Sequence, residues 1–197
     1  NEIILYFSEI LLKIFVNFNL SYPCSLVLFI NLRRVKKIYS QKVNKRIIIL
    51  TKSGGLEDIL SVYKNPDKNN DIAYYILPRS LIKIIFHKFL KNEIYQDYST
   101  NDSSEKVTNK KKAYKSFIKK TFWKLNKFWK FSAIIGFNPF YYAENDLPEP
   151  IKDLGKKFLV VHKESVHSPA QHKINFEVYR DQNKKHHANK VAVYCEY

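Results

Sequence analysis

Short polar segments that each follow an apolar, β-branched run carry the residue types most suited to binding or chemistry. The first segment is Thr51–Asp58 (TKSGGLED). Gly54 and Gly55 allow a ligand to approach the backbone closely, and free N–H groups at the start of a following helix favour an anion. The segment matches neither a dinucleotide-binding glycine fingerprint nor a P-loop. It indicates either an anion site or a tight strand-to-helix turn in which Ser53 caps the helix.

The second segment is Gly136–Glu144 (GFNPFYYAE). Ligands of open α/β sheets bind beyond the carboxyl ends of the strands, where Asn138, Tyr142 and Glu144 are expected to project. Amide and phenol groups suit a saccharide or polyol, because they combine hydrogen bonds with an aromatic face. The alternative is that the aromatic rings pack between helix and sheet and that Asn138 caps a helix.

The third segment, Val161–Pro169 (VHKESVHSP), places ionisable groups in a row after an apolar run. His162 and Lys163 are candidates for binding an acceptor or its phosphate, and Glu164 is the candidate base that accepts a proton from an attacking hydroxyl. The alternative is an ordinary Lys–Glu pair in a surface loop.

The histidines and cysteines lack the spacing of a metal site. His162, His167 and His172 recur at intervals that do not align on a helix and that cross a predicted strand, loop and helix. Cys24 and Cys195 are the only cysteines, too few for a disulfide framework. The sequence therefore predicts no metal and favours a reduced, cytoplasmic setting.

The elements that must position these residues alternate along the chain from residue 46 onward. Short apolar runs alternate with helix-length amphipathic segments, which is typical of βαβ units and a parallel sheet. The predicted strands are Arg46–Thr51, Asp71–Leu77, Ser132–Phe137, Lys157–His162 and Lys190–Glu196. The predicted helices are Leu56–Tyr63, Ser80–Lys91, Lys110–Lys130, Phe140–Leu154 and Pro169–Asp181. The predicted fold is a Rossmann-like open parallel sheet with helices on both faces.

Parallel strands end at the same edge of a sheet, so residues that follow different strands are expected to meet there. The residues predicted to converge on this edge are Gly54, Gly55, Asn138, Tyr142, Lys163 and Glu164.

The chain divides at about residue 45. Residues 1–45 form an apolar and basic segment that we expect to be helical, and residues 46–197 form the Rossmann-like domain. Within the domain, residues 95–109 are polar and predict a long mobile loop, whereas residues 110–131 predict a basic amphipathic helix. The apolar stretch from Ile3 to Ile30 is interrupted by charged residues, asparagines and a proline, so it predicts no membrane-spanning helix.

The basic helix suggests a surface for polyanions. The chain carries a formal net charge of +16, and the helix repeats Ile118, Phe122, Leu125 and Trp129 at helical spacing among many lysines. This composition is typical of a membrane-surface helix, although a crossover helix with a solvated lysine face would share it. A nucleic-acid groove is the least favoured interpretation, because no recognised motif is present. The candidate membrane-surface residues are Lys119, Lys120, Trp123, Lys124, Lys127 and Trp129.

The series GGLEDIL, YYILPRSL, GFNPFYYAENDL, KFLVVHKESVHSP and KVAVYCEY resembles the N-terminal domain of GT-B glycosyltransferases that build cell-surface polysaccharides. That group is related to the CDP-glycerol glycerophosphotransferases. The resemblance covers residues 46–197, and Val161–Pro169 is its most specific part. It implies that this half binds a saccharide or a lipid- or phosphate-linked acceptor. A nucleotide-activated donor would then bind a separate C-terminal half, and this half would hold no cofactor.

The absence of methionine and the initial Asn1 suggest that the sequence is a fragment, which we expect to be inactive alone. Two other classes remain open beside the transferase. One is a non-catalytic module that binds a membrane surface, and the other is a basic nucleic-acid-binding protein. We expect a cytoplasmic location, either free or peripheral at the inner face of the membrane.

Overall fold

The computed structural model describes residues 2–35, 43–51, 72–93, 105–137, 142–163 and 188–194. Two predicted helices, Leu56–Tyr63 and Pro169–Asp181, lie outside the described residues, as do residues 95–104 of the predicted loop. Residues 105–109, predicted as the end of that loop, are helical instead. The described residues form an α/β fold with a mostly parallel sheet, compatible with a Rossmann-like fold.

Within the described residues the sheet has six strands, in the order β1-β3-β2-β4-β5-β6. The strands are β1 (Arg33–Arg34), β2 (Lys45–Thr51), β3 (Ile72–Pro78), β4 (Ala133–Gly136), β5 (Lys157–Lys163) and β6 (Lys190–Tyr194). All pairs are parallel except β1 with β3, which is antiparallel. The predicted parallel sheet of five strands is confirmed. The edge strand β1 was not predicted, because two exposed arginines carry no apolar signal.

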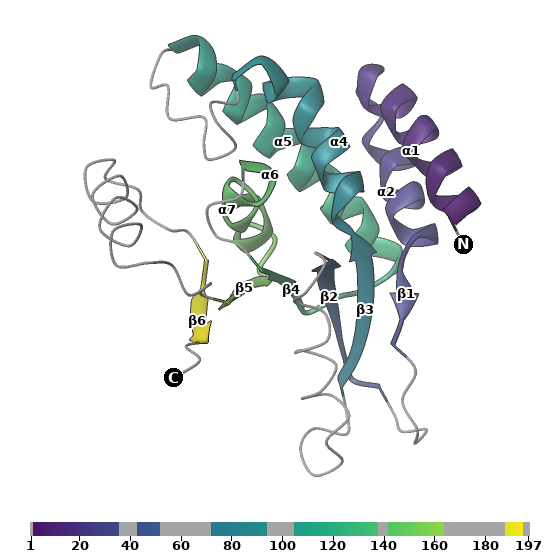
Figure 1. Ribbon diagram of the computed structural model, residues 1–197, viewed down its shortest axis with the longest axis vertical. Helices are drawn as coiled ribbons and strands as arrows, with labels where there is room; N and C mark the ends of the chain where they lie inside the picture. The colour runs from purple at the N-terminus through teal and green to yellow at the C-terminus, as the bar shows by residue number, and fades with distance from the viewer. Residues whose placement is uncertain are drawn as a thin grey trace.

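The register of the strands gives the sheet two distinct faces. Ile48 pairs with Ile134, which in turn pairs with Phe158, so these buried side chains line one face. Their neighbours Ile49 and Ile135 pair with each other and point to the opposite face. Figure 1 shows the described helices gathered on one side of the sheet, and their buried side chains join the Ile48 face.

The helices that cover this face confirm the helical segments predicted within the described residues. They are α1 (Glu2–Asn17), α2 (Ser21–Ile30), α4 (Arg79–Leu90), α5 (Glu105–Phe128), α6 (Tyr142–Asn145) and α7 (Pro148–Lys152), with a 3₁₀ turn, η1 (Lys91–Glu93), after α4. Asn19 adopts a left-handed conformation with φ 57° and reverses the chain between α1 and α2. The segment predicted as one helix over Phe140–Leu154 is split into α6 and α7, because Pro148 begins a new helix.

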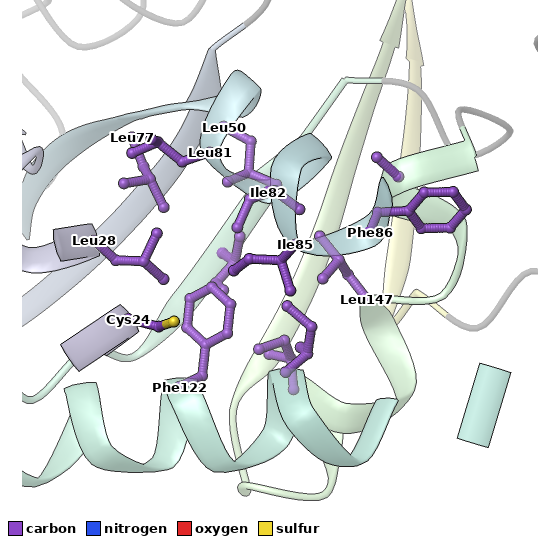
Figure 2. Close-up of a cluster of buried hydrophobic side chains, with 14 of the residues drawn as sticks. Cys24, Leu28, Leu50, Leu77, Leu81, Ile82, Ile85, Phe86, Phe122 and Leu147 are labelled. Carbon is purple, nitrogen blue, oxygen red and sulfur yellow. The ribbon is translucent and has the colours of Figure 1, made fainter. Parts of the chain in front are cut away.

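The hydrophobic core lies between these helices and the sheet (Figure 2). Cys24 and Leu28 of α2 lie near Phe122 of α5, beneath Leu81 and Ile85 of α4. All of these side chains are fully buried. Burial also raises the pKa of the Cys24 thiol to about 12. The N-terminal helices therefore share one core with the sheet.

Candidate functional site

The carboxyl ends of the parallel strands lie along one edge of the sheet. Thr51 at the end of β2 pairs with Pro78 at the end of β3, and the Thr51 hydroxyl donates a hydrogen bond to the Leu77 carbonyl at 3.4 Å. On the other side of β2, Gly136 ends β4 and pairs with Val160 of β5. The strand order places the end of β2 between the ends of β3 and β4.

The structure describes only some of the predicted site residues at this edge. His162 and Lys163 are the last residues of β5, and their backbone pairs with β6. The structure does not describe the side chains of these two residues. Four other predicted site residues lie entirely outside the described residues: Gly54, Gly55, Asn138 and Glu164. The predicted convergence therefore stays a prediction for these residues, although the strands that precede them do end at a common edge.

A buried ion pair joins two of the connections that leave this edge. Arg79 is the first residue of α4, directly after β3, and Glu144 lies on α6, after β4. Arg79 Nε lies 2.6 Å from Glu144 Oε1, and the side chains are only 10% and 1% exposed. The Phe137 N–H donates a hydrogen bond to Glu144 Oε2 at 3.3 Å. Glu144 thus ties the start of α4 to the backbone that follows β4.

Gly136 makes room for this carboxylate. A Cβ atom at this position would lie 2.6 Å from Glu144 Oε2 and 3.2 Å from Cζ of Phe158. The first distance is shorter than the contacts that Cβ atoms make in proteins, and Phe158 is itself buried. The glycine is therefore required by the close approach of Glu144.

Tyr142 packs against α4 and does not project freely from the edge. Its ring stacks on His87, with ring centroids 5.9 Å apart and planes inclined by 11°. The Tyr142 hydroxyl lies 3.4 Å from His87 Nε2, and Lys83 Nζ lies 5.9 Å from the centre of the Tyr142 ring. Tyr142 and Glu144 are both buried, so each anchors the connection after β4. Their predicted contact with an acceptor stays a prediction.

His87 provides a pH-dependent reporter of this packing. Burial lowers the pKa of His87 below its ordinary value of 6.5, and the positive charges of Lys83 and Lys91 lower it further. The unfolded chain therefore binds the proton more readily, and the free energy of unfolding should rise with pH between the lowered pKa and 6.5. Above 6.5 this contribution should be flat.

Urea unfolding of the protein and of His87→Phe between pH 5 and 7 measures this effect. Phenylalanine keeps an aromatic ring beside Tyr142 and removes the titrating group. We expect a shallower rise of the unfolding free energy with pH for the variant. An identical slope for both proteins would contradict the lowered pKa.

The same connection is tied to α5 through polar contacts. The buried Tyr114 hydroxyl donates to the Ala143 carbonyl at 3.3 Å. Burial raises the pKa of Tyr114, and the negative charges of Asp146 and Glu144 raise it further, so the phenol stays protonated. Lys115 lies 3.6 Å from Asp146 and also pairs with Glu149.

Lys115 stays charged in this setting. Burial by itself would lower the pKa of Lys115, but the hydrogen bond to Glu149 and the charge of Asp146 outweigh burial and raise it. On the next turn of α5, Lys119 Nζ lies 2.8 Å from Asp153 Oδ2 after α7. Lys119, predicted to face a membrane, is therefore engaged with an acidic side chain of the same domain.

The apolar side of α5 faces the core, which corrects the interpretation of this helix as a membrane helix inserted by its aromatic side. Ile118, Phe122 and Leu125 are fully buried. Trp129 is 9% exposed, with its ring 4.7 Å from the Tyr75 ring and 5.5 Å from the Arg46 guanidinium. Hydrophobic spacing identifies the buried side of an amphipathic helix but not what covers it.

The remaining predicted surface residues of α5 do face outward. Trp123 is 47% exposed, and Lys127 Nζ lies 4.2 Å from the centre of its ring. Lys120 is exposed, and Lys124 Nζ lies 5.4 Å from the centre of the Tyr22 ring on α2.

Sequence reasoning missed Arg79 and His87, the partners of Glu144 and Tyr142 at the carboxyl edge of the sheet. Arg79 had a usable signal, because a charged residue follows an apolar strand run directly in YYILPRSL. His87 had none, because a lone histidine on an amphipathic helix is common. Within the described ranges, no group of acidic, histidine or cysteine side chains is arranged to hold a metal ion. Nor does any described helix have the length and apolarity needed to cross a membrane.

No family, curated protein or solved structure matches this chain. The sheet topology and the polar cluster at its carboxyl edge therefore carry the functional argument.

Proposed function

We propose that this chain is the acceptor-binding half of a glycosyltransferase or glycerophosphotransferase that builds cell-surface polysaccharide. The observation that carries the proposal is the order of the parallel strands. β2 lies between β3, which follows it in the chain, and β4, which comes after β3. Open α/β sheets bind ligands at such a switch point, outside the carboxyl ends of the strands.

The polar groups beside this switch point divide into two roles. Arg79 and Glu144 are positioning residues, because their charges compensate each other and both side chains are buried. They fix the connections after β3 and β4. The acceptor would be held by residues at or just after the strand ends, among them Lys163, the last residue of β5, which would supply a positive charge for a phosphate. Glu164, the next residue, would accept the proton of the attacking hydroxyl.

The proposal is tested by NMR titration of the ¹⁵N-labelled chain with a short glycerol-phosphate oligomer. We expect the amides of Thr51, Phe137 and Lys163 to shift, because they mark the carboxyl ends of β2, β4 and β5. Amides at the amino ends, such as Ala133, should stay unchanged. Shifts at the amino ends, or none with any saccharide or polyol phosphate offered, would contradict the proposal.

Two lysines on one strand give a matched control. Lys163→Gln removes a charge at the carboxyl end of β5, and Lys157→Gln removes one at its amino end. Losing one charge-assisted contact to phosphate corresponds to about 1.5–3 kcal/mol, so Lys163→Gln should weaken binding by roughly tenfold or more. Lys157→Gln should leave binding unchanged. Equal effects of both variants would indicate attraction by net charge alone.

A further inference from the structure

The outer side of α1 exposes an unusual number of large apolar side chains. Its inner side contributes Leu12 and Val16 to the core, and both are buried. The outer side carries apolar residues where a helix on the surface of a domain ordinarily carries polar ones. These residues are Ile3, Ile4, Tyr6, Phe7, Ile10, Leu11 and Ile14, with exposed fractions from 37% to 71%.

Exposed apolar side chains also lie on α2 and near the end of α5. α1 packs on α2 and α2 packs on α5, which leaves α1 at the outer margin of the molecule (Figure 1). Tyr22, Phe29 and Ile30 of α2 are 52%, 39% and 65% exposed. The rings of Phe29 and Phe128 meet at 5.4 Å, which links the exposed part of α2 to α5. We call the exposed apolar side chains of these helices together the α1–α2 face.

Cationic and interfacial aromatic side chains border the α1–α2 face. Lys124 lies over Tyr22, and Lys127 lies over the exposed ring of Trp123. Lys120 on the same helix is exposed, as is Lys13 on α1. The acidic side chains of α1 are Glu2 and Glu9. The border is therefore predominantly basic, in a chain whose formal net charge is +16.

We propose that the α1–α2 face docks on an anionic membrane surface. Apolar side chains of α1 and α2 would enter the boundary between headgroups and acyl chains, as amphipathic helices that lie in the membrane plane do. Tyr22 and Trp123 have the amphipathic rings that favour the headgroup level. Lys120, Lys124 and Lys127 would contact anionic headgroups while their alkyl stems cover apolar surface. The proposal is independent of the transferase assignment.

Vesicle binding by the full 197-residue chain tests the proposal. The probes are vesicles of phosphatidylcholine alone and vesicles with about one-third phosphatidylglycerol. We expect cosedimentation with the acidic vesicles that weakens as salt is raised, because exposed charges are screened over about 8–10 Å at physiological ionic strength. Failure to bind acidic vesicles at low salt would overturn the proposal.

Charge variants with equal net charge locate the contact. Lys120→Gln/Lys124→Gln/Lys127→Gln removes three charges at the α1–α2 face. A lysine near an acidic membrane contributes roughly a fivefold gain in affinity, so this variant should bind about 100-fold more weakly. The control, Lys88→Gln/Lys106→Gln/Lys112→Gln, removes exposed lysines of α4 and of the first turns of α5. The control should keep most of the binding, and equal losses would overturn the assignment to this face.

Apolar variants and an oligomerisation assay separate a membrane from a second copy of the chain. Phe7→Gln/Ile10→Gln/Ile14→Gln replaces side chains that are 60%, 37% and 45% exposed, so the fold should persist by circular dichroism. We expect vesicle binding to fall at least tenfold. If light scattering instead shows a dimer that the variant dissociates, and acidic vesicles do not bind, a second copy covers this face and the membrane proposal is wrong.

Tryptophan fluorescence gives a second measure of docking that needs no substitution on α1 or α2. Trp123 is 47% exposed and Trp129 is 9% exposed. Docking should move Trp123 out of water, so its emission should shift to the blue, and brominated lipid should quench it. Trp123→Phe should abolish both changes, whereas Trp129 should stay silent. Quenching that persists in Trp123→Phe would contradict the proposed orientation.

Discussion

Glu144→Gln should lower the free energy of unfolding by about 3 kcal/mol or more, because removal of one partner leaves the other charge of a buried ion pair uncompensated. Arg79 Nε lies 2.6 Å from the Glu144 carboxylate, and the side chains are only 10% and 1% exposed. Glutamine has nearly the same shape as glutamate, so the loss would report charge and hydrogen bonding more than packing. Urea unfolding followed by circular dichroism measures the difference.

An exposed ion pair of the same domain provides the matched control. Asp153 pairs with Lys119 at 2.8 Å, with side chains 50% and 45% exposed. Asp153→Asn makes the same carboxylate-to-amide change where water screens the pair, so it should alter stability by less than about 1 kcal/mol. The double variant Arg79→Met/Glu144→Leu should recover most of the stability lost by Glu144→Gln, because replacing both members of a buried ion pair with apolar side chains leaves no unpaired charge in the interior. If Glu144→Gln and Asp153→Asn lowered the free energy of unfolding by similarly small amounts, burial would not make the Arg79–Glu144 pair more important for stability than an exposed pair.

The strands could be predicted from the sequence because each main strand is a nearly continuous run of apolar, β-branched or aromatic residues. Runs such as Arg46–Thr51 and Lys157–His162 coincide within a residue or so with β2 and β5. Parallel strands of α/β proteins have this composition, and turn residues mark their ends. Strand β1 escaped because a two-residue edge strand of arginines is defined by its pairing with Ile76 and Tyr75 and not by its own composition.

The partners of helix faces could not be predicted from periodicity. The repeat of Phe122, Leu125 and Trp129 correctly marked an apolar side of the helix, but that side is covered by the core. The exposed apolar surface belongs instead to α1, which is apolar on nearly all sides, so its sequence does not distinguish the buried side from the exposed one. Packing against α2 and α4 determines which side of α1 is buried.

The ion pair at the carboxyl edge was beyond sequence reasoning for a similar reason. Glu144 was predicted as an acceptor-binding residue because it follows a strand, and its position after β4 is correct. Its partner Arg79 lies 65 residues earlier in the chain. Only the sheet order brings the residues that follow β3 and β4 together across β2.

Gly136→Ala should destabilise the fold by about 2–3 kcal/mol, because overpacking a tightly filled site forces neighbours out of position. The added methyl would lie 2.6 Å from Glu144 Oε2 and 3.2 Å from the buried Phe158 ring. The carboxylate cannot move without lengthening its contacts with Arg79 and with the Phe137 N–H. The expected loss therefore comes from the ion pair as well as from the crowded ring, and thermal unfolding measures it.

Gly155→Ala distinguishes this steric cost from the general cost of replacing a glycine. Gly155 has φ 69° and no heavy atom within 4 Å of the position a Cβ would take, so its substitution should cost about 1–2 kcal/mol through left-handed backbone strain alone. The losses from Gly155→Ala and Glu144→Ala should add when the two are combined, because the sites share no contact. Gly136→Ala and Glu144→Ala should cost clearly less together than the sum of their separate losses, since truncation of Glu144 removes the atom that the new methyl would strike. Additive losses at Gly136 and Glu144 would mean that the glycine does not serve the carboxylate.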